Sequence, residues 1–359
     1  MITERLLSAK HKFRKDLEPE GLSSAEVEAR RVFLREIYKD VNYVNVSQCP
    51  YCGGKDFTKI SEVSKKFLPS EVVICDSCEG CFKSRILNDS AARRHYQTLS
   101  YALRGKGLSE LEIENLFKKR LRLFARPRQK FISHFADLVP GRDLIAELGC
   151  NDGANLLPWK ELGFSVLGIE LDSVPAQCGR RHGIDIVEAD LMTYEFELRK
   201  PKVIILSHVL GHVSDINRFM AHLSAVIAPD GYIFIETPNI RYYGALNTSG
   251  YFDVEFNYCF DTKSLATVLE RHGFWIIYID EFSRVFCARQ SQVGKSLAKG
   301  RALPVSAGTI LLQLAIRALD YREIGLYDLL RLGLEGDFRA SLIARLKKRY
   351  FDRFYRLFS

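Results

Sequence analysis

The sequence predicts an α/β protein built on a largely parallel sheet, with a cysteine-rich region ahead of it and helical segments at both ends. Three observations predict this class. Short apolar runs alternate with helix-like patterns between residues 126 and 290, an order typical of βαβ units. A glycine turn, "ELGCNDG", follows the first of these runs, and two C-x-x-C pairs lie upstream of it.

The composition is that of an ordinary globular protein. The chain has 359 residues, of which 47% are hydrophobic and 27% charged, enough for two or three units with cores of their own. The net charge of +8 suits an anionic substrate, nucleic acid or a membrane surface and selects none of them. No stretch resembles a signal peptide or a membrane span. We therefore expect a cytoplasmic protein whose nine cysteines are thiols or metal ligands.

Changes of composition divide the chain into five regions. Residues 1–43 are charged and helix-like, and residues 44–88 hold five of the nine cysteines together with short β-rich pieces. Residues 89–125 return to helical character. Residues 126–290 form the region of alternating strands and helices, and residues 291–359 are expected to be a helical C-terminal extension.

Seven apolar runs in residues 126–290 predict strands. In chain order they are "DLIAEL", "SVLGIEL", "IDIVEAD", "KVIILSH", "YIFIETP", "WIIYI" and "SRVFCAR". The clearest helix between them has an apolar stripe at positions 216, 219, 220, 223, 226 and 227 and stops at Pro229-Asp230-Gly231, a helix-end signal. A second helical piece, "TKSLATVLERHGF", precedes the last two strands.

The cysteine-rich region predicts a structural zinc site. Two C-x-x-C pairs lie 22 residues apart, and the tight turn in each brings two thiolates together at one tetrahedral Zn²⁺. The predicted ligands are Cys49, Cys52, Cys75 and Cys78. Cys81 is a fifth thiol, which could replace Cys78 or pack in the core. A closed four-thiolate site stabilises the fold and is not expected to be catalytic.

The glycine turn disfavours a dinucleotide. In a G-x-G-x-x-G turn the middle glycine lets the backbone approach a pyrophosphate. Here Asn151 takes that place between Gly149 and Gly153, and Asp152 adds negative charge where phosphates would lie. A cofactor with a positive centre and no phosphate, S-adenosylmethionine, fits this turn better.

Acidic residues at successive strand ends support the same cofactor. Glu147, near the end of the first strand, favours its cationic end. Glu170 lies 21 residues after Gly149, where an acid accepts hydrogen bonds from ribose hydroxyls, and Asp190 is placed for the adenine amino group. The remaining candidate cofactor contacts are Leu171, Leu191, Ser207 and His208. The alternative is a sheet with solvated carboxylates at its strand ends.

Several motifs in residues 45–290 resemble one known family. "ELGCNDG" resembles the first motif, E-x-G-x-N-D-G, of bacterial sugar methyltransferases, and "LSHVLGHVSD" resembles their fourth-strand motif, with Gly211 in place of the usual glutamate. "APDGYIFIETPN" and "FDTKSLATVLERHGF" resemble the later segments, and "CFKSRILNDSAARRHYQTLSY" resembles the end of their zinc-ribbon half. The chain thus resembles a class I S-adenosylmethionine-dependent methyltransferase. The resemblance implies a Rossmann-like, seven-stranded sheet whose last strand is antiparallel.

The segments that follow the fourth and fifth strands provide catalytic candidates. Methyl transfer is an in-line displacement, in which the enzyme mainly aligns the reactants, although a hydroxyl or an enolisable carbon also needs a base. The candidates are His208, His212, Glu236, Tyr251, Asp253 and Tyr258. Residues 250–260 have the polar and aromatic composition expected of a substrate loop, and an ordinary surface connection is the alternative.

One departure from the family bears on the reaction. Its sugar C-methyltransferases carry a Y-H-E-H signature near this loop, where we compare "FNYC" at residues 256–259. The histidine base expected for C-methylation is missing, so we favour O- or N-methylation.

The sequence therefore predicts a methyltransferase for a small-molecule acceptor, which we expect to be a sugar, a nucleotide-sugar or a glycan intermediate. A zinc-containing RNA methyltransferase is an alternative, because the basic segments 119–130 and 345–356 include aromatics. A degenerate domain used as a scaffold is a third. The basic aromatic tail, "ARLKKRYFDRFYRLFS", could lie on an anionic membrane or a partner helix, or pack on its own domain.

Overall fold

A seven-stranded sheet organises the chain from residue 144 to residue 289. The computed structural model describes residues 2–4, 6, 11–14, 22–64, 67–99, 103, 109–197, 199–240, 252–280 and 283–289. These residues belong to one unit, residues 1–292, and a second unit comprises residues 293–359. The predicted C-terminal extension and its basic aromatic tail lie outside the described residues.

The strand order of this sheet is β13-β14-β11-β10-β7-β8-β9. The strands are β7 (Leu144–Leu148), β8 (Ser165–Glu170), β9 (Ile186–Glu188), β10 (Val203–Ser207), β11 (Tyr232–Glu236), β13 (Phe274–Ile279) and β14 (Arg284–Arg289). Neighbouring strands are parallel except that β14 runs antiparallel to both β11 and β13. The prediction of seven strands with an antiparallel last strand is therefore confirmed.

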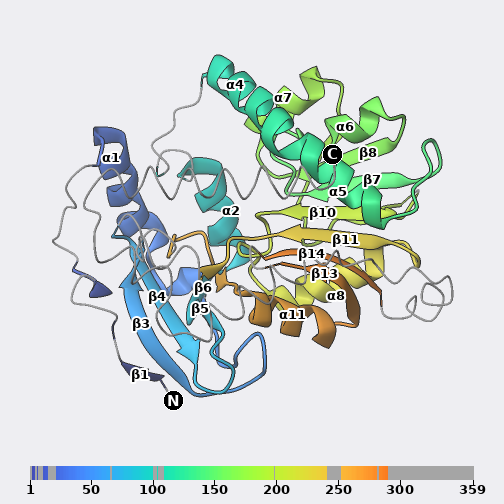
Figure 1. Ribbon diagram of the computed structural model, residues 1–359. Coiled ribbons are helices and arrows are strands. Elements are labelled where there is room, and N and C mark those ends of the chain that lie inside the picture. The colour runs from blue at the N-terminus through green and yellow to red at the C-terminus, as the bar shows by residue number, and fades with distance from the viewer. Residues whose placement is uncertain are drawn as a thin grey trace, which may run out of the picture. The chain divides into compact units, whose positions relative to one another are not determined.

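Helices cover both faces of the sheet. Figure 1 shows α4 (Glu110–Arg120), α5 (Arg126–Phe135), α6 (Leu157–Glu161) and α7 (Ser173–Arg181) on one side, and α8 (Ile216–Val226) and α11 (Thr262–Arg271) on the other. The predicted apolar stripe of α8 is buried in the core. Asp215 caps α8 by accepting a hydrogen bond from the backbone N–H of Arg218, which satisfies one otherwise unpaired donor at the helix start.

The cysteine-rich region forms a second sheet, of order β1-β3-β4-β5-β12. Its strands are β1 (Ile2–Glu4), β3 (Phe57–Val63), β4 (Pro69–Cys75), β5 (Cys81–Lys83) and β12 (Tyr258–Cys259). The last of these comes from the region that also builds the seven-stranded sheet, and it pairs antiparallel with β5. Two of the predicted regions, residues 44–88 and residues 126–290, therefore contribute strands to the same sheet.

A two-stranded ribbon and several helices complete the N-terminal part. β2 (Tyr43–Asn45) pairs with β6 (Arg85–Leu87). The helical segments are α1 (Ser24–Val32), η2 (Phe33–Ile37), η3 (Asp40–Asn42), α2 (Asp89–Thr98) and η4 (Leu121–Ala125), the last joining α4 to α5. A capping box between Ser23 and Glu26 starts α1.

One hydrophobic core connects the two sheets. Tyr51, in the first C-x-x-C pair, packs edge-on against Phe82 of β5 and Phe260, with ring centroids 6.0 and 5.8 Å apart. Tyr258 of β12 belongs to the same cluster. Within the part of the chain that the structure describes, no helix has both the length and the apolar character needed to cross a membrane.

Candidate cofactor and acceptor site

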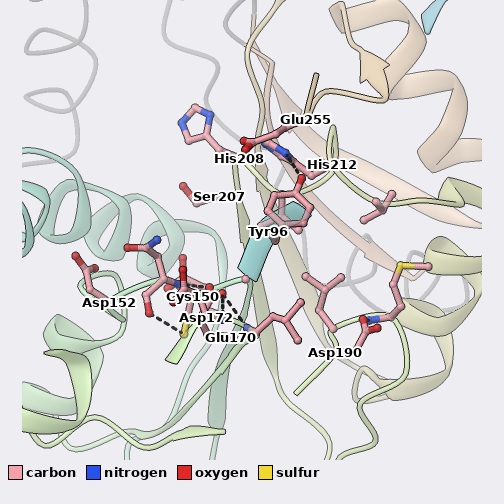
Figure 2. Close-up of a pocket in the computed structure, with 18 of the residues that line it drawn as sticks. Tyr96, Cys150, Asp152, Glu170, Asp172, Asp190, Ser207, His208, His212 and Glu255 are labelled. Atoms are coloured by element: carbon pink, nitrogen blue, oxygen red, sulfur yellow. Dashed lines mark hydrogen bonds between the residues drawn. The ribbon is translucent and has the colours of Figure 1, made fainter. Parts of the chain in front are cut away.

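A cavity of about 660 Å³ opens beside the carboxyl ends of β7, β8 and β10. Its cofactor side includes every predicted cofactor residue except Gly153. These residues are Glu147, Gly149, Asn151, Asp152, Glu170, Leu171, Asp190, Leu191, Ser207 and His208. Figure 2 shows Glu170 and Asp152 at one end of the cavity, and Tyr96, His212 and Glu255 gathered at the other.

The turn after β7 has a left-handed backbone at three positions. Gly149, Asn151 and Gly153 have φ of 68°, 54° and 70°, and glycine and asparagine tolerate this region best. A Cβ on Gly149 would also lie 2.7 Å from Cγ2 of Val209. A Cβ on Gly153 would instead meet Ile186 and Ile184 at 3.1–3.3 Å. Gly153 thus allows close packing in the core and does not line the cavity, contrary to its assignment as a cofactor contact.

Glu170 joins the two loops at the floor of the cavity. One carboxylate oxygen accepts hydrogen bonds from the backbone N–H groups of Leu171 and Asp172, at 2.8 and 2.9 Å. The other accepts from the N–H of Asn151 at 2.7 Å. Burial raises the pKa of Glu170, and these three backbone bonds act in the opposite direction. The carboxylate is therefore fixed in place before any ligand arrives.

Glu147 is buried at the end of β7 with half of its carboxyl group unsatisfied. Oε1 accepts a hydrogen bond of 2.6 Å from Asn155 Nδ2, whereas Oε2 has no partner among the described residues. Burial raises the pKa of Glu147 to about 8. Because Glu147 also lines the cavity, a cationic ligand there would stabilise its charged form.

Two arginines from the helices before β7 complete this side of the cavity. Arg120, the last residue of α4, binds the side chains of Asn151 and Asp152 through Nη1. Arg128, in α5, lines the cavity and donates to Asn155 Oδ1 at 2.9 Å. We did not predict either residue. Their spacing, with Phe124 between them at intervals of four, was the available signal for a shared helix face.

Glu236 lies behind the cavity wall. Arg128 Nε donates to its Oε2 at 2.7 Å, and His208 Nε2 lies 3.7 Å from its Oε1. Burial acts to raise the pKa of Glu236, but the positive charges of Arg128 and His208 outweigh it and lower the pKa to about 2. Glu236 is therefore a permanently ionised partner of Arg128 and is absent from the residues that line the described cavity.

Helix α2 supplies much of the acceptor side, which we did not predict. Residues 89, 92, 93, 96 and 97 line the cavity, a spacing that marks one helix face. Tyr96 Oη and His212 Nδ1 share a hydrogen bond of 2.9 Å (Figure 2). His95, which precedes Tyr96 in α2, has its Nε2 atom 3.3 Å from Oε1 of Glu255.

The segment 253–256 forms the facing wall. Asp253, Glu255 and Phe256 line the cavity, and the Phe256 ring packs 4.5 Å from that of His212. Of the "FNYC" segment, only Phe256 lines the described cavity, whereas Asn257, Tyr258 and Cys259 do not.

Tyr258, a catalytic candidate of this loop, is not among the residues that line the described cavity. Tyr258 is buried in β12, where its hydroxyl accepts from the N–H of Ile216 and donates to the carbonyl of Ser214, both at 3.2 Å. It holds the start of α8, so we withdraw it as a catalytic candidate. Tyr251 lies outside the described residues.

The four predicted zinc ligands lie together. The Sγ atoms of Cys49, Cys52, Cys75 and Cys78 are all within 4.8 Å of one another, and Cys49–Cys78 and Cys52–Cys75 are each separated by 3.6 Å. A tetrahedral Zn²⁺ with bonds of about 2.3 Å needs sulfurs about 3.8 Å apart, so the donor set fits this ion. Cys81 instead faces Cys259 across the β5–β12 pair.

Comparisons with known proteins agree with this architecture. Residues 113–279 match a family model described as a methyltransferase domain. The C-methyltransferase NovU of Streptomyces niveus is 28% identical over 144 residues, which cover 38% of this chain and 33% of that protein. The match thus spans about a third of the curated relative's length.

Solved structures of low identity are also similar. Magnesium protoporphyrin IX methyltransferase from Synechocystis PCC 6803, with bound SAH, is 14% identical with a TM-score of 0.42, over 56% of this chain and 100% of that one. The CcbJ methyltransferase from Streptomyces caelestis is 12% identical with a TM-score of 0.39, over 47% and 90%. On the family match and the strand order together, residues 113–279 lie in a class I S-adenosylmethionine-dependent methyltransferase domain.

Proposed function

We propose that the protein transfers a methyl group from S-adenosylmethionine to a small-molecule acceptor, a sugar, nucleotide-sugar or glycan intermediate. One observation carries the proposal. A single cavity has fixed carboxylates at the strand ends on one side and the Tyr96–His212 pair on the other. The cofactor, when bound, supplies a methyl group already activated on a sulfonium. The protein's own residues then have to align the acceptor and take up its proton.

The cofactor side suits a cationic, phosphate-free ligand. Glu147 offers its unpartnered buried oxygen to the ammonium end, and Glu170, held by three backbone N–H groups, offers its remaining lone pairs to the ribose. Asp190 accepts through Oδ1 from the N–H of Met192 at 2.9 Å and through Oδ2 from Arg93 at 3.3 Å, and these two bonds hold it where we propose that the adenine binds. Arg120 fixes the turn between them through Asn151.

His212 is the base that we propose for the acceptor. If its Nδ1–H donates to the Tyr96 hydroxyl, Nε2 carries the lone pair that takes the acceptor's proton. Tyr96 fixes the ring in that tautomer, and Asp253 and Glu255 position the acceptor from the opposite wall. The wall segment 253–256 itself carries no histidine, and Phe256 packs on the His212 ring; we therefore favour O- or N-methylation over C-methylation.

The four cysteines hold a structural Zn²⁺ in this proposal. The second C-x-x-C pair leads within three residues into β5, whose partner β12 directly follows the wall segment 253–256. The metal therefore stabilises the acceptor side of the cavity rather than the cofactor side.

Titration calorimetry with S-adenosylmethionine, followed by radiolabelled methyl transfer to nucleotide-sugars, amino sugars and structured RNA, tests the proposal. We expect micromolar cofactor binding and label transfer to a sugar-bearing acceptor, with His212→Gln binding the cofactor normally but transferring little label. Label incorporated only into RNA would favour the RNA alternative. If the protein bound no S-adenosylmethionine at millimolar concentration, both methyltransferase hypotheses would be refuted and the non-enzymatic scaffold would remain.

A further inference from the structure

A second group of ligand-type side chains lies between α4 and α7, two helices that are neighbours in Figure 1. Glu114 lies in α4 and Cys178 in α7, and His182 is the residue that caps the C-terminal end of α7. Glu114 Oε2 lies 3.0 Å from His182 Nε2 and 3.8 Å from Cys178 Sγ, and all three ligand atoms are within 4.8 Å of one another. We propose that these three residues bind a Zn²⁺ ion, with water as the fourth ligand, at a site distinct from the four-cysteine cluster.

The ligand types and their placement suit zinc. A thiolate, an imidazole and a carboxylate are the three side chains that Zn²⁺ prefers, and three protein ligands with one open position is a common arrangement. Cys178 lies in α7 and His182 caps the C-terminal end of that helix four residues later, so the two side chains are on the same side of the helix. Zinc bonds of about 2.0–2.3 Å require ligand atoms about 3.3–3.7 Å apart, and the two measured separations, 3.0 and 3.8 Å, lie on either side of that range.

Neighbouring groups already hold two of the ligands in orientation. Lys118 Nζ lies 3.3 Å from the other carboxylate oxygen of Glu114, which leaves Oε2 directed at Cys178 and His182. Phe117 stacks on the His182 ring, with centroids 3.9 Å apart and planes within 6°. Outer partners of this kind are what fix metal ligands in position.

The ligand set also balances charge. A Cys178 thiolate and the Glu114 carboxylate together would neutralise the two charges of a bound Zn²⁺. The side chains of Glu114 and His182 are 26% and 28% exposed, which leaves access for the ion and a water.

A metal at this site would stabilise the glycine turn at residues 149–153 through the two helices that contact it. α4 ends in Arg120, which binds the side chain of Asn151. Gly179, next to Cys178, packs so closely on the turn that a Cβ there would lie 2.5 Å from the carbonyl oxygen of Asp152. A metal that links α4 to α7 therefore connects the two elements that hold this turn.

Metal stoichiometry of the full chain tests the inference independently of methyl transfer. The protein is freed of loosely bound metal with a weak chelator, titrated with Zn²⁺ and, in parallel, with Co²⁺, whose thiolate charge-transfer bands report cysteine ligation. We expect one further equivalent above the four-cysteine site. Cys178→Ala and Glu114→Gln should each lose that equivalent while retaining the other metal.

The control is His222→Gln, because His222 Nδ1 lies 3.7 Å from Glu195 Oε1 in a histidine–carboxylate pair for which the described residues offer no third ligand. It should keep the wild-type stoichiometry. A wild-type protein that takes up no second equivalent at 100 µM Zn²⁺, or a second equivalent that both variants retain, would overturn the proposal. Circular dichroism of each variant separates loss of the site from loss of the fold.

Discussion

The side chain of Lys83, in β5, donates a hydrogen bond to the backbone carbonyl of Val254, between the two acidic residues of the acceptor wall. Lys83 is 4% exposed, and its burial lowers its pKa to about 8. A residue next to the zinc-binding pairs thus holds the segment that faces the acceptor.

Lys83→Met should weaken acceptor binding and leave cofactor binding unchanged. The substitution preserves the length of the side chain but leaves the Val254 carbonyl unpaired, at a cost on the order of 1–2 kcal/mol. We expect the KM for the acceptor to rise about 10-fold, with the Kd for S-adenosylmethionine constant by calorimetry. Arg85→Met is the control, because Arg85 lies two residues further along, in β6, and pairs with the exposed Asp40. Equal effects on both ligands would contradict this role.

Tyr96→Phe and His212→Gln should both reduce kcat without changing cofactor affinity. Loss of a general base typically costs 10²–10⁴-fold, so we expect that range for His212→Gln. Tyr96→Phe removes only the hydrogen bond that orients the His212 ring, so kcat should fall less, by about 10-fold. The dependence of kcat on pH separates the two roles. The fall of kcat at acidic pH should persist in Tyr96→Phe and disappear in His212→Gln. An unchanged fall in both variants would point to another base.

Cofactor affinity should rise with pH between about 6 and 8 because of Glu147. Its pKa is raised to about 8 in the ligand-free protein, so at pH 7 most molecules carry the neutral acid, and a cationic ligand must drive off the proton. Calorimetry in buffers of different ionisation enthalpy should record release of up to about one proton per ligand at pH 7. Glu147→Gln should abolish both the release and the pH dependence.

The same shift has a consequence for the stability of the free protein. A carboxyl whose folded-state pKa exceeds its unfolded value stabilises the fold fully below the unfolded pKa, 4.5, and loses that contribution as pH rises through about 8. Between these values Glu147→Gln should therefore become progressively less destabilising relative to wild type. Denaturant unfolding at pH 5 and pH 8 measures the difference. A constant difference would show that Glu147 titrates normally.

Arg120→Ala should loosen the glycine turn. Arg120 binds the side chains of both Asn151 and Asp152, and the pair with Asp152 is almost fully buried on the carboxylate side. We expect cofactor affinity to fall about 10-fold, the cost of one charged hydrogen bond. Arg122→Ala, exposed and two residues along, is the matched control. Equal losses would indicate a general effect of positive charge.

Cys52→Ser should remove the metal from the four-cysteine site and destabilise the acceptor wall before the cofactor side. Structural zinc contributes directly to folding, and β5 depends on the pair that contains Cys75 and Cys78. We expect one equivalent of zinc fewer by elemental analysis, a lower melting temperature and loss of acceptor methylation with residual cofactor binding. Cys81→Ala, outside the cluster, should keep the metal.

The sequence could predict the elements whose pattern is local. The strands from "DLIAEL" to "SRVFCAR" are short apolar runs between turn signals, and buried parallel strands have that pattern wherever they occur. The same holds for the turn around Gly149, where backbone conformation restricts the residue type, and for the cysteine pairs, where spacing determines ligand geometry. In these cases the neighbours in sequence are also the neighbours in space.

The acceptor side could not be predicted in this way because its residues come together only in the fold. Tyr96 meets His212 from a helix more than a hundred positions upstream, and Arg120 reaches the cofactor turn from a helix that composition marked only as basic. Tyr258 differs for another reason. Polar and aromatic residues are typical of a substrate loop, but Tyr258 forms, with Cys259, a strand of the five-stranded sheet. Gly153 was assigned to the cofactor, although its lack of a side chain serves core packing.

The pairing of β5 with β12 affects how the chain is made. Cys81 and Cys259 lie opposite each other but are separated by 178 positions in the chain. During synthesis, β5 therefore emerges well before its partner β12. At about 5–20 residues per second this delay is about 10–35 s, during which the edge of β5 is open to other strands. An N-terminal fragment that ends before residue 258 would lack β12 and leave that edge of β5 unpaired.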